Sequence, residues 1–342
     1  MPTRHGSTDP SLDWAEQVAP DEAERHARFS ETISDIQSRV NARHGPGRAF
    51  HRTQVAGLRG TLEVSSRLPR LAAQGLFAQP GSYPTLIRLS NGSITPMADA
   101  MPDIRGFALS VRGVEGPSAL GGTTDRQDFL LINHPTFGFR DTRDFAPVVP
   151  LAARGQGALV KGLIAEQGLL GGAAESARLV KNLSTWFPGF ATATFHSAAP
   201  LCWGPYAAKV RLVPQQRGVS MTAALDWHAD FRRRLAADDL RWHLEAQFFI
   251  DETQTPIEDG RVRWSESASP FLRVATLTVA RQDIDAPAGQ VLAEQIEAGR
   301  FDPWAGLADH RPLGEIMRAR KVAYLASQQL RAAGDVPGDT LA

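Results

Sequence analysis

An arginine and a tyrosine near the C-terminus are spaced so that they could act together. Arg320 and Tyr324 lie in PLGEIMRARKVAYLASQQLRAAGD, a stretch whose apolar residues gather on one side as in a helix. Residues i and i+4 of a helix are neighbours, so the Arg320 guanidinium would lie over the face that carries the Tyr324 phenol. A phenol with an ordinary pKa of about 10 is a poor iron ligand at neutral pH. A cation against its oxygen favours the phenolate, which is a strong, hard donor for ferric haem. The alternative is a surface helix in which a cation covers an aromatic ring.

A second group of unusual residues lies in the first third of the chain. His51 follows Arg48 and precedes Gly57 and Gly60 in RAFHRTQVAGLRGTLEV. A strand that contains glycines has a backbone that a flat ligand or another strand can approach closely. Arg48 and Arg88, where they face inward, need anionic partners, and the carboxylates of a haem propionate meet that need. The alternative for His51 is a structural histidine whose hydrogen bonds are satisfied.

The remaining polar residues of these segments are expected to have structural roles. Asn91, Asp103 and Asp141 suit turns, caps or ion pairs with nearby arginines. The single cysteine, Cys202, excludes an intrachain disulfide and a cysteine-based zinc site, and it suits a small buried position. The 37 basic and 37 acidic side chains balance, so the charge gives no argument for nucleic acid or an anionic membrane as partner.

The elements that must position these residues can be predicted from hydrophobic periodicity. Apolar and polar residues alternate around 87–90, 107–112, 208–212, 242–248 and 275–279, which predicts strands. The chain lacks the strand and helix alternation of a parallel sheet. We therefore expect an α+β fold, in which a large antiparallel sheet closes as a barrel with helices as insertions and at the ends. A mostly polar helical pattern from residue 12 to about 42 predicts an arm that packs on the body of the fold or on a second subunit.

The chain divides into an N-terminal helical arm over 1–45 and a main domain over 46–342. A helical insertion is expected at about 142–186 and C-terminal helices at about 288–335. Pro312 suits the first turn of the last helix, and Gly334 and Pro337 suit its end. The first residues lack the apolar core of a signal peptide. The most apolar region is interrupted by Lys161 and Glu166 and is too short to span a bilayer, so we expect a cytoplasmic protein.

The order of several short motifs resembles that of the haem-containing catalases, in the shortened form of the catalase-related peroxidases. The motifs are RxxH followed by glycines (48–60), RLSN (88–91), DIRGFA (103–108), FRD followed by a phenylalanine (139–145), IEDGRVRWSES (257–267) and RxxxY (320–324). They run from about Arg48 to Arg331, which is most of the chain. The resemblance implies a catalase-like antiparallel eight-stranded β-barrel with a C-terminal helix that ligates haem b.

Carried over residue by residue, the resemblance implies a role for each matching position. Tyr324 would be the axial ligand of the haem iron, with Arg320 holding it as phenolate. His51 would be the distal histidine that moves the peroxide proton, and Asn133 would be the distal amide that orients the outer oxygen. The remaining cofactor-binding residues would be Arg48, Arg88 and Arg331 at the propionates and Phe145 on the distal haem face.

The implied function is a haem-dependent peroxidase that reduces hydrogen peroxide or organic hydroperoxides through a high-valent iron-oxo intermediate, with weak catalase activity as a side reaction. Its partners would be a small peroxide and an organic reductant, without nucleic acid or a membrane span. A homodimer or a higher homo-oligomer is left open.

Two departures from the family pattern keep rival functions open. Asn133 stands alone where the family has two adjacent asparagines, and an ungapped alignment places it on the second of them, one place from the catalytic one. Phe50 replaces a small branched residue before the distal histidine. The first rival is a fatty-acid hydroperoxide dehydratase or isomerase, as in allene-oxide-synthase-like relatives. The second is a non-catalytic haem-binding protein.

Overall fold

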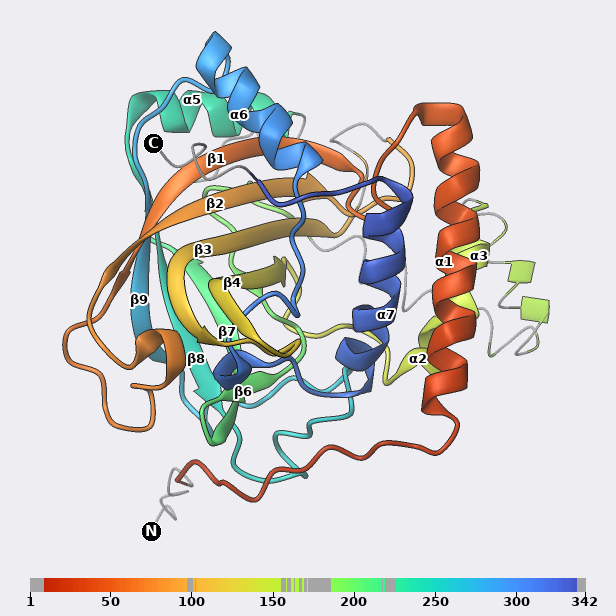
Figure 1. Ribbon diagram of the computed structural model, residues 1–342, viewed down its shortest axis with the longest axis horizontal. Coiled ribbons are helices and arrows are strands. Elements are labelled where there is room, and N and C mark those ends of the chain that lie inside the picture. The colour runs from red at the N-terminus through yellow and green to blue at the C-terminus, as the bar shows by residue number, and fades with distance from the viewer. Residues whose placement is uncertain are drawn as a thin grey trace.

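Nine strands form one antiparallel sheet that closes on itself. The computed structural model describes residues 9–96, 101, 103–154, 158, 161, 162, 164, 165, 168, 171, 186–216, 218 and 226–336. Among these residues the strand order is β5-β4-β3-β2-β1-β9-β8-β7-β6, and β5 also pairs with β7. The second pairing closes a ring of eight strands, with β6 as a side hairpin on β7 (Figure 1). The predicted α+β class with a closed antiparallel barrel is confirmed.

The strands have alternating faces, as the sequence pattern predicts. They are β1 (Thr53–Val64), β2 (Ser82–Asn91), β3 (Arg105–Pro117), β4 (Thr123–Ile132), β5 (Phe195–His196), β6 (Leu201–Trp203), β7 (Tyr206–Pro214), β8 (Leu240–Phe248) and β9 (Leu272–Val279). The five segments predicted as strands fall in β2, β3, β7, β8 and β9. Leu109 of β3, Leu244 of β8 and Leu277 of β9 have no exposed surface and belong to the main core cluster. Successive side chains of a strand point to opposite faces, so the apolar half of each pattern fills the barrel.

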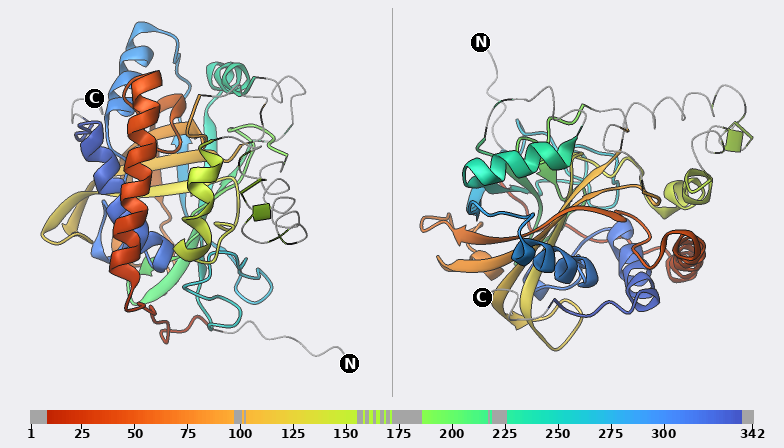
Figure 2. Two further views of the ribbon diagram at one scale, coloured as in Figure 1. Left: turned by 90° about the vertical axis from the view of Figure 1, so that its right-hand side faces the viewer. Right: turned by 90° about the horizontal axis from the view of Figure 1, so that it is seen from above.

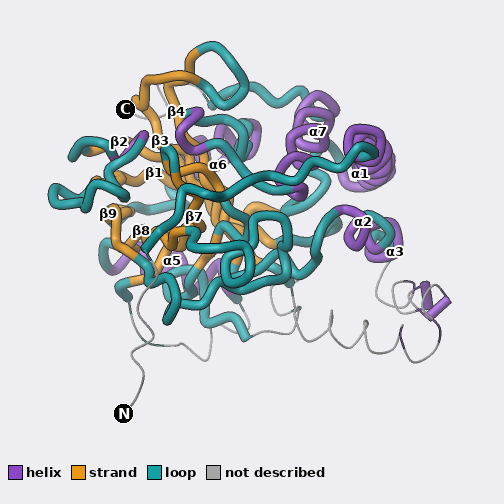
Figure 3. Tube along the Cα trace, turned by 90° about the horizontal axis from the view of Figure 1, so that it is seen from below, coloured by secondary structure: helices purple, strands orange, loops and turns teal. Residues whose placement is uncertain are grey.

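The helices gather outside the barrel, chiefly at one end and over β1. They are α1 (Glu22–His44), α2 (Thr142–Phe145), α3 (Val148–Ala152), α5 (Trp227–Ala237), α6 (Pro287–Ala298) and α7 (Glu315–Leu330), with short 3-10 turns η1 (Gly75–Phe77) and η2 (Ala308–His310). α1 and α7 run side by side (Figures 1 and 2), and α2 and α3 lie next to α1 (Figure 3). Of the described helices, none has the length and apolar character needed to cross a membrane.

The N-terminal arm is helical over a shorter stretch than predicted. α1 begins at Glu22, and residues 9–19 carry no helix. Their polar groups bind other parts of the chain instead: the Ser11 N–H donates to the Phe249 carbonyl at 2.9 Å, and the Gln17 N–H donates to the Glu258 carboxylate at 2.8 Å. The helical part packs on the body of the fold, because Phe29 of α1 shares a core cluster with Ala323 of α7.

The last helix also begins later than predicted, whereas α6 begins at Pro287, next to the predicted start at about 288. α7 begins at Glu315 because Gly314 has a φ of 88°, a left-handed conformation that a right-handed helix excludes. Pro312 lies before the helix and pairs with Leu201 in an isolated bridge. Residues 142–152 of the predicted insertion form α2 and α3, but most of 155–185 and Pro337 lie outside the described residues.

The glycines of β1 make room for other parts of the chain. A Cβ at Gly57 would lie 2.8 Å from the Ala293 Cα of α6, and one at Gly60 would lie 2.9 Å from the Thr278 carbonyl oxygen of β9. The close approach expected from these glycines is therefore made by a helix and a neighbouring strand. At Gly57 it lets α6 rest directly on β1. Cys202 is buried as expected, and burial raises the pKa of its thiol to about 11.

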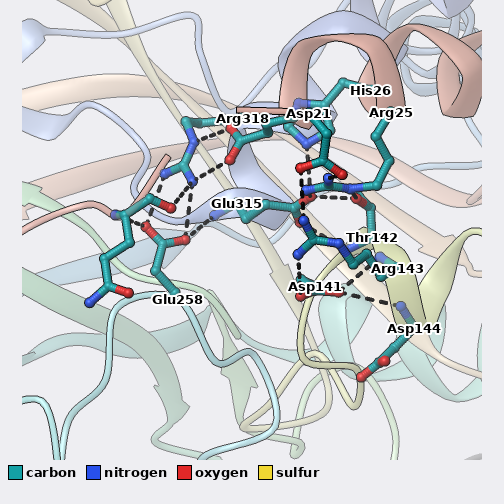
Figure 4. A network of polar contacts seen from close by, with 12 residues as sticks. Asp21, Arg25, His26, Asp141, Thr142, Arg143, Asp144, Glu258, Glu315 and Arg318 are labelled. Carbon is teal, nitrogen blue, oxygen red and sulfur yellow. Dashed lines mark hydrogen bonds and ion pairs between the residues drawn. The ribbon is translucent and has the colours of Figure 1, made fainter. Parts of the chain in front are cut away.

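A buried ionic network fixes the start of α7 against α1 and α2 (Figure 4). Glu315 is 4% exposed; one carboxylate oxygen lies 2.8 Å from His26 Nε2 and 3.0 Å from Arg25 Nη2, and the other accepts from the Thr142 N–H at 2.8 Å. Burial disfavours the ionised carboxylate, but the hydrogen bonds from His26, Thr142 and Arg25 outweigh it and lower the pKa of Glu315 to about 2.

A second cation of α7 ties the extended N-terminal segment to the same helix. Arg318 forms ion pairs with Glu16 at 2.6 Å, with Glu22 at 2.6 Å and with Glu258 at 3.1 Å. Glu16 precedes α1 and Glu22 begins it, so the arm is held along its length. Three carboxylates on one guanidinium form a network, which contributes more than isolated surface pairs do.

Replacing Glu315 by glutamine should lower the free energy of unfolding by about 3 kcal/mol at neutral pH, because Arg25 and His26 would lose a buried anion. A fall in pKa from 4.5 to about 2 corresponds to roughly the same energy. The folded-state pKa is depressed, so the stabilisation is complete above the ordinary carboxyl pKa and is lost as the pH falls toward the folded-state value.

Urea unfolding of the native chain and Glu315→Gln, from neutral pH down to about pH 3, measures this difference. Glu24→Gln is the matched control, because the Glu24 side chain is 73% exposed. A stability gap between the native chain and Glu315→Gln that stays constant as the pH falls would contradict the role of the ionised carboxylate.

Candidate functional site

Arg320 and Tyr324 meet on one face of α7, as their spacing predicts. Arg320 Nη2 donates to Tyr324 Oη at 2.8 Å, and the guanidinium carbon lies 5.0 Å from the centroid of the phenol ring. Arg320 Nη1 also lies 3.3 Å from the Met317 sulfur, one turn earlier. Hydrogen bonds from a guanidinium are strongest to an anionic acceptor. The helix therefore presents a phenol oxygen in a setting that suits a hard, anionic metal ligand.

Three arginines converge on the last turn of α6. Arg48 Nη1 donates to one carboxylate oxygen of Glu297 at 2.5 Å, and Arg88 Nε donates to the other at 2.8 Å. Arg331, directly after the end of α7, donates to two main-chain carbonyls of the same turn at 3.1 and 2.8 Å. Arg88 is 3% exposed, so its charge needs a nearby anion. The three residues predicted to bind carboxylates are thus brought together.

This arginine cluster carries more positive than negative charge. Arg48 and Arg88 bind the Glu297 carboxylate, and Arg331 binds main-chain carbonyls beside it. Among the described residues these three guanidinium groups thus share one carboxylate, which leaves two positive charges in excess. Burial lowers the pKa of Arg48 well below its ordinary value, and the charge of Arg88 acts in the same direction. Burial likewise lowers the pKa of Arg331 to about 10. A dianion placed here would relieve this repulsion.

His51 is held in an unusual conformation two residues before the start of β1. Its φ is 52°, in the left-handed region that costs a non-glycine residue roughly 1–2 kcal/mol. Its N–H donates to the Gly92 carbonyl at 2.9 Å, and its Nδ1 lies 3.1 Å from Ser90 Oγ. Gly106 of β3 makes room for the ring, because a Cβ there would lie 2.5 Å from Nδ1. Such local strain, held in place by its surroundings, is typical of functional residues.

The electrostatic surroundings of His51 keep its ring neutral. Burial lowers the pKa of His51 to about 3, and the charges of Arg88, Arg320 and Arg48 act in the same direction. When Nδ1 donates to Ser90, the neutral ring can accept a proton at Nε2. Ala49, two residues before His51, shares a core cluster with Ala323, which precedes Tyr324 on α7. α7 and the segment before β1 therefore lie against each other.

An aromatic cluster adjoins this histidine. The Phe145 ring centroid, on α2, lies 5.0 Å from that of Phe137, 5.1 Å from Phe139, 5.6 Å from Phe29 and 6.3 Å from Phe50. Phe50 directly precedes His51 in the chain. The rings therefore form an apolar cluster at the segment that leads into His51, and a flat apolar ligand could pack on it.

Asn133 has a different setting from the other predicted site residues. Its side-chain oxygen accepts from the Arg105 N–H at 2.7 Å, and its own N–H donates to the Arg105 carbonyl at 3.1 Å. Ile132 stands directly opposite Gly106 in the β3–β4 register, and directly paired residues share a face of the sheet. That face is the one that His51 covers. Within the described residues no hydrogen bond joins Asn133 to His51, so its role as distal amide stays a prediction.

The residues expected to be structural make structural contacts. The Asn91 side chain accepts from Arg105, and Asp103 accepts from the Ser93 N–H at 2.9 Å. Asp141 is the N-cap of α2 and accepts from the N–H of Arg143 at 2.8 Å. The Asn91 contact joins the end of β2 to the start of β3, and the Asp141 contact fixes the start of α2.

Two residues of the site were not singled out from the sequence. Ser90 follows Arg88 by two residues on β2, so the two side chains must share one face, and this spacing could have identified it. Glu297 is separated from Arg48 by 249 positions in the sequence, and no sequence pattern near either residue predicts their ion pair. Only the way α6 packs on β1 brings them together.

Comparisons with known proteins support the fold. No family model and no curated protein sequence gives a significant match. Similar solved structures are a fungal catalase (TM-score 0.67, 17% identity), a bacterial catalase (0.66, 18%) and catalase A from Saccharomyces cerevisiae (0.66, 17%). The alignments cover 99%, 99% and 95% of this chain and 68%, 66% and 67% of those chains. The chain therefore has the catalase fold and spans about two thirds of the length of these catalases.

Replacing Gly106 by alanine should displace the His51 imidazole from Ser90, because the new methyl group would overlap the ring. Overpacking of this kind lowers the free energy of unfolding by about 1–3 kcal/mol. Urea unfolding measures the loss, and NMR follows the imidazole signal that His51→Ala removes. Gly334→Ala is the control, since a Cβ at Gly334 meets no atom within 4 Å. An unmoved His51 signal in Gly106→Ala would show that Gly106 does not position the ring.

Proposed function

We propose that this protein is a haem-dependent peroxidase of the catalase superfamily, in its short catalase-related branch, which reduces hydrogen peroxide or organic hydroperoxides. One observation carries the proposal. A guanidinium-bound phenol on α7, a histidine before β1 and the arginine cluster lie next to one another. Arg48 and Arg331 bind the same Gly299 carbonyl, and Ala49 shares a core cluster with Ala323 of α7. The catalase fold agrees with this assignment but does not by itself distinguish a peroxidase from a catalase.

The residues present fit haem b. A haem offers two propionate carboxylates, two apolar ring faces and an iron that in its ferric form binds hard, anionic ligands. The arginine cluster matches the two propionates in charge: Arg48, Arg88 and Arg331 would hold them. Tyr324 would ligate the iron with Arg320 at its oxygen, and Phe145 would pack on a ring face. When bound, the haem supplies the redox chemistry of its iron.

His51 would move the proton of the peroxide. Its neutral Nε2 can accept a proton from one peroxide oxygen and return it to the other, while Ser90 at Nδ1 holds the ring in place. The same imidazole serves as base and then as acid, so the protein ends each transfer in its starting charge state. The nearby arginine charges disfavour the protonated form of His51, which favours return of the proton to the peroxide.

The polarity of the site favours peroxidase over catalase activity. Ile132 places an apolar side chain on the same sheet face as Gly106, which is the face that the His51 ring covers. A hydrocarbon group cannot orient a second hydrogen peroxide by hydrogen bonding. An organic reductant, which can pack on apolar groups, suits this surface better. We therefore assign weak catalase activity and a peroxidase reaction with an organic donor.

The same apolar surroundings support a second candidate function. Ile132, Phe50 and Phe145 together would accommodate the alkyl chain of a fatty-acid hydroperoxide, which a haem enzyme can dehydrate or isomerise. Product analysis separates the two candidates. A peroxidase converts a lipid hydroperoxide to the alcohol and oxidises the added donor, whereas a dehydratase forms an epoxide or ketone without consuming a donor.

Tyr324→Phe should weaken haem binding and alter the ferric absorption spectrum, because the phenol oxygen that would ligate the iron is removed. His51→Ala should bind haem with an unchanged ferric ligand band but lose at least about 100-fold in the rate of peroxide reduction, as expected when a general acid–base group is removed. Haem titration and stopped-flow absorption measure both effects. Tyr206→Phe is the control for loss of a phenol elsewhere in the chain. An unchanged ferric spectrum in Tyr324→Phe would contradict the axial assignment.

Asn133→Ala tests whether the amide acts on peroxide or only on the backbone. The structure predicts a loss of about 1–3 kcal/mol in the free energy of unfolding, because the Arg105 N–H would lose its acceptor. An amide that acts only on the backbone would leave the rate of peroxide reduction by the haem-loaded protein within about twofold of the native rate. A rate loss of about 100-fold with unchanged stability would instead support Asn133 as the distal amide.

A further inference from the structure

The Glu297 carboxylate occupies the position in the arginine cluster that an external carboxylate would need. Its two oxygens receive hydrogen bonds from Arg48 at 2.5 Å and from Arg88 at 2.8 Å. Across the part of the chain that the structure describes, no other carboxylate forms an ion pair with either arginine. A carboxylate of the chain itself, that of Glu297, therefore already pairs with both cations.

We infer that Glu297 is an internal counter-ion that stands in for a haem propionate, so that its carboxylate and the haem compete for Arg48 and Arg88. The inference rests on the haem site proposed above. Glu297 is then a positioning residue of the haem-free protein, and the loaded protein has the Glu297 side chain turned away from the two arginines.

The exposure of the three side chains indicates which of them would move. The Arg88 side chain is 3% exposed and that of Arg48 is 13% exposed, whereas that of Glu297 is 36% exposed. A buried guanidinium that lost its anion would have no water to replace it. A glutamate at the end of a helix regains its hydration by rotating outward. Moving out of the ion pair therefore costs less free energy for the Glu297 side chain than for the two arginine side chains.

Main-chain contacts would keep the cluster in place while Glu297 leaves. Arg48 Nη2 donates to the Gly299 carbonyl at 2.8 Å, and Arg331 Nη2 donates to the same carbonyl at 2.8 Å. Arg88 Nη2 lies 3.4 Å from the Arg52 carbonyl. None of these contacts uses the Glu297 side chain. The site for two propionates therefore stays formed when the internal carboxylate swings out.

A contact that exists only in the haem-free protein has two linked consequences. It stabilises the haem-free fold, and it weakens haem binding by the same free energy, because that contact must be given up when haem binds. Its removal must therefore destabilise the haem-free protein and tighten haem binding together. If the contact instead persisted in the haem-free and the haem-loaded protein, its removal would lower the stability of both and would not increase the affinity for haem.

The test compares Glu297→Gln with Glu294→Gln, which removes the same charge from an exposed position on the same helix. Two quantities are measured: the thermal midpoint of the haem-free protein, and the dissociation constant for haem by absorption titration. We expect Glu297→Gln to lower the haem-free midpoint by a few degrees and to tighten haem binding about 10-fold. Glu294→Gln should change neither.

Haem dimethyl ester provides a second arm, because its propionates are uncharged esters that cannot replace a carboxylate. The gain in affinity of Glu297→Gln should vanish with this ligand. An equal gain with haem and with its dimethyl ester would overturn the competition between carboxylates.

Two other results would overturn the inference. One is a lower midpoint in both haem-free and haem-loaded Glu297→Gln with unchanged or weaker haem binding, which would make Glu297 a permanent part of the site. The other is no change in either quantity.

If Glu297→Gln does not fold without haem, Glu297→Asp replaces it and should shift both quantities in the same directions by less. Native protein that binds no haem would refute the proposed function itself, whereas native binding without the gain in Glu297→Gln refutes only the role of Glu297.

Discussion

The need to compensate buried guanidinium charge organises the candidate site. Arg88 on β2 and Arg48 before β1 both reach the last turn of α6, and Arg331 reaches the same turn from the end of α7. α6 can supply this turn only because Gly57 lets it lie directly on β1. These hydrogen bonds and ion pairs hold the barrel, α6 and α7 together, because each buried guanidinium group needs a partner from another element.

The position of Tyr324 follows from constraints at both ends of α7. At its start, Glu315 and Arg318 bind α1, the extended N-terminal segment and the loop that carries Glu258. Just past its end, Arg331 binds the last turn of α6. Between these anchors, α7 packs against apolar residues of α1. A phenol held in this way is preorganised, which is what a metal ligand needs if binding is not to cost additional ordering.

Local rules predicted much of this structure, and long-range contacts decided the rest. Alternation identified strands because the barrel has an apolar inner face, and i,i+4 spacing identified the Arg320–Tyr324 pair because helix geometry is local. The start of α1 was misplaced, since the residues before Glu22 bind distant parts of the chain. The face that Ile132 presents depends on the register between β3 and β4, and the pairing of Glu297 with Arg48 depends on the packing of α6. Neither leaves a signal in the neighbouring sequence.

The proposed function depends on whether the protein binds haem through Tyr324 and the arginine cluster. The most direct measurement is the haem content of the purified native protein after haem-supplemented expression, determined by the pyridine haemochrome method. We predict one haem per chain. A colourless protein that still binds no haem when titrated would contradict the account.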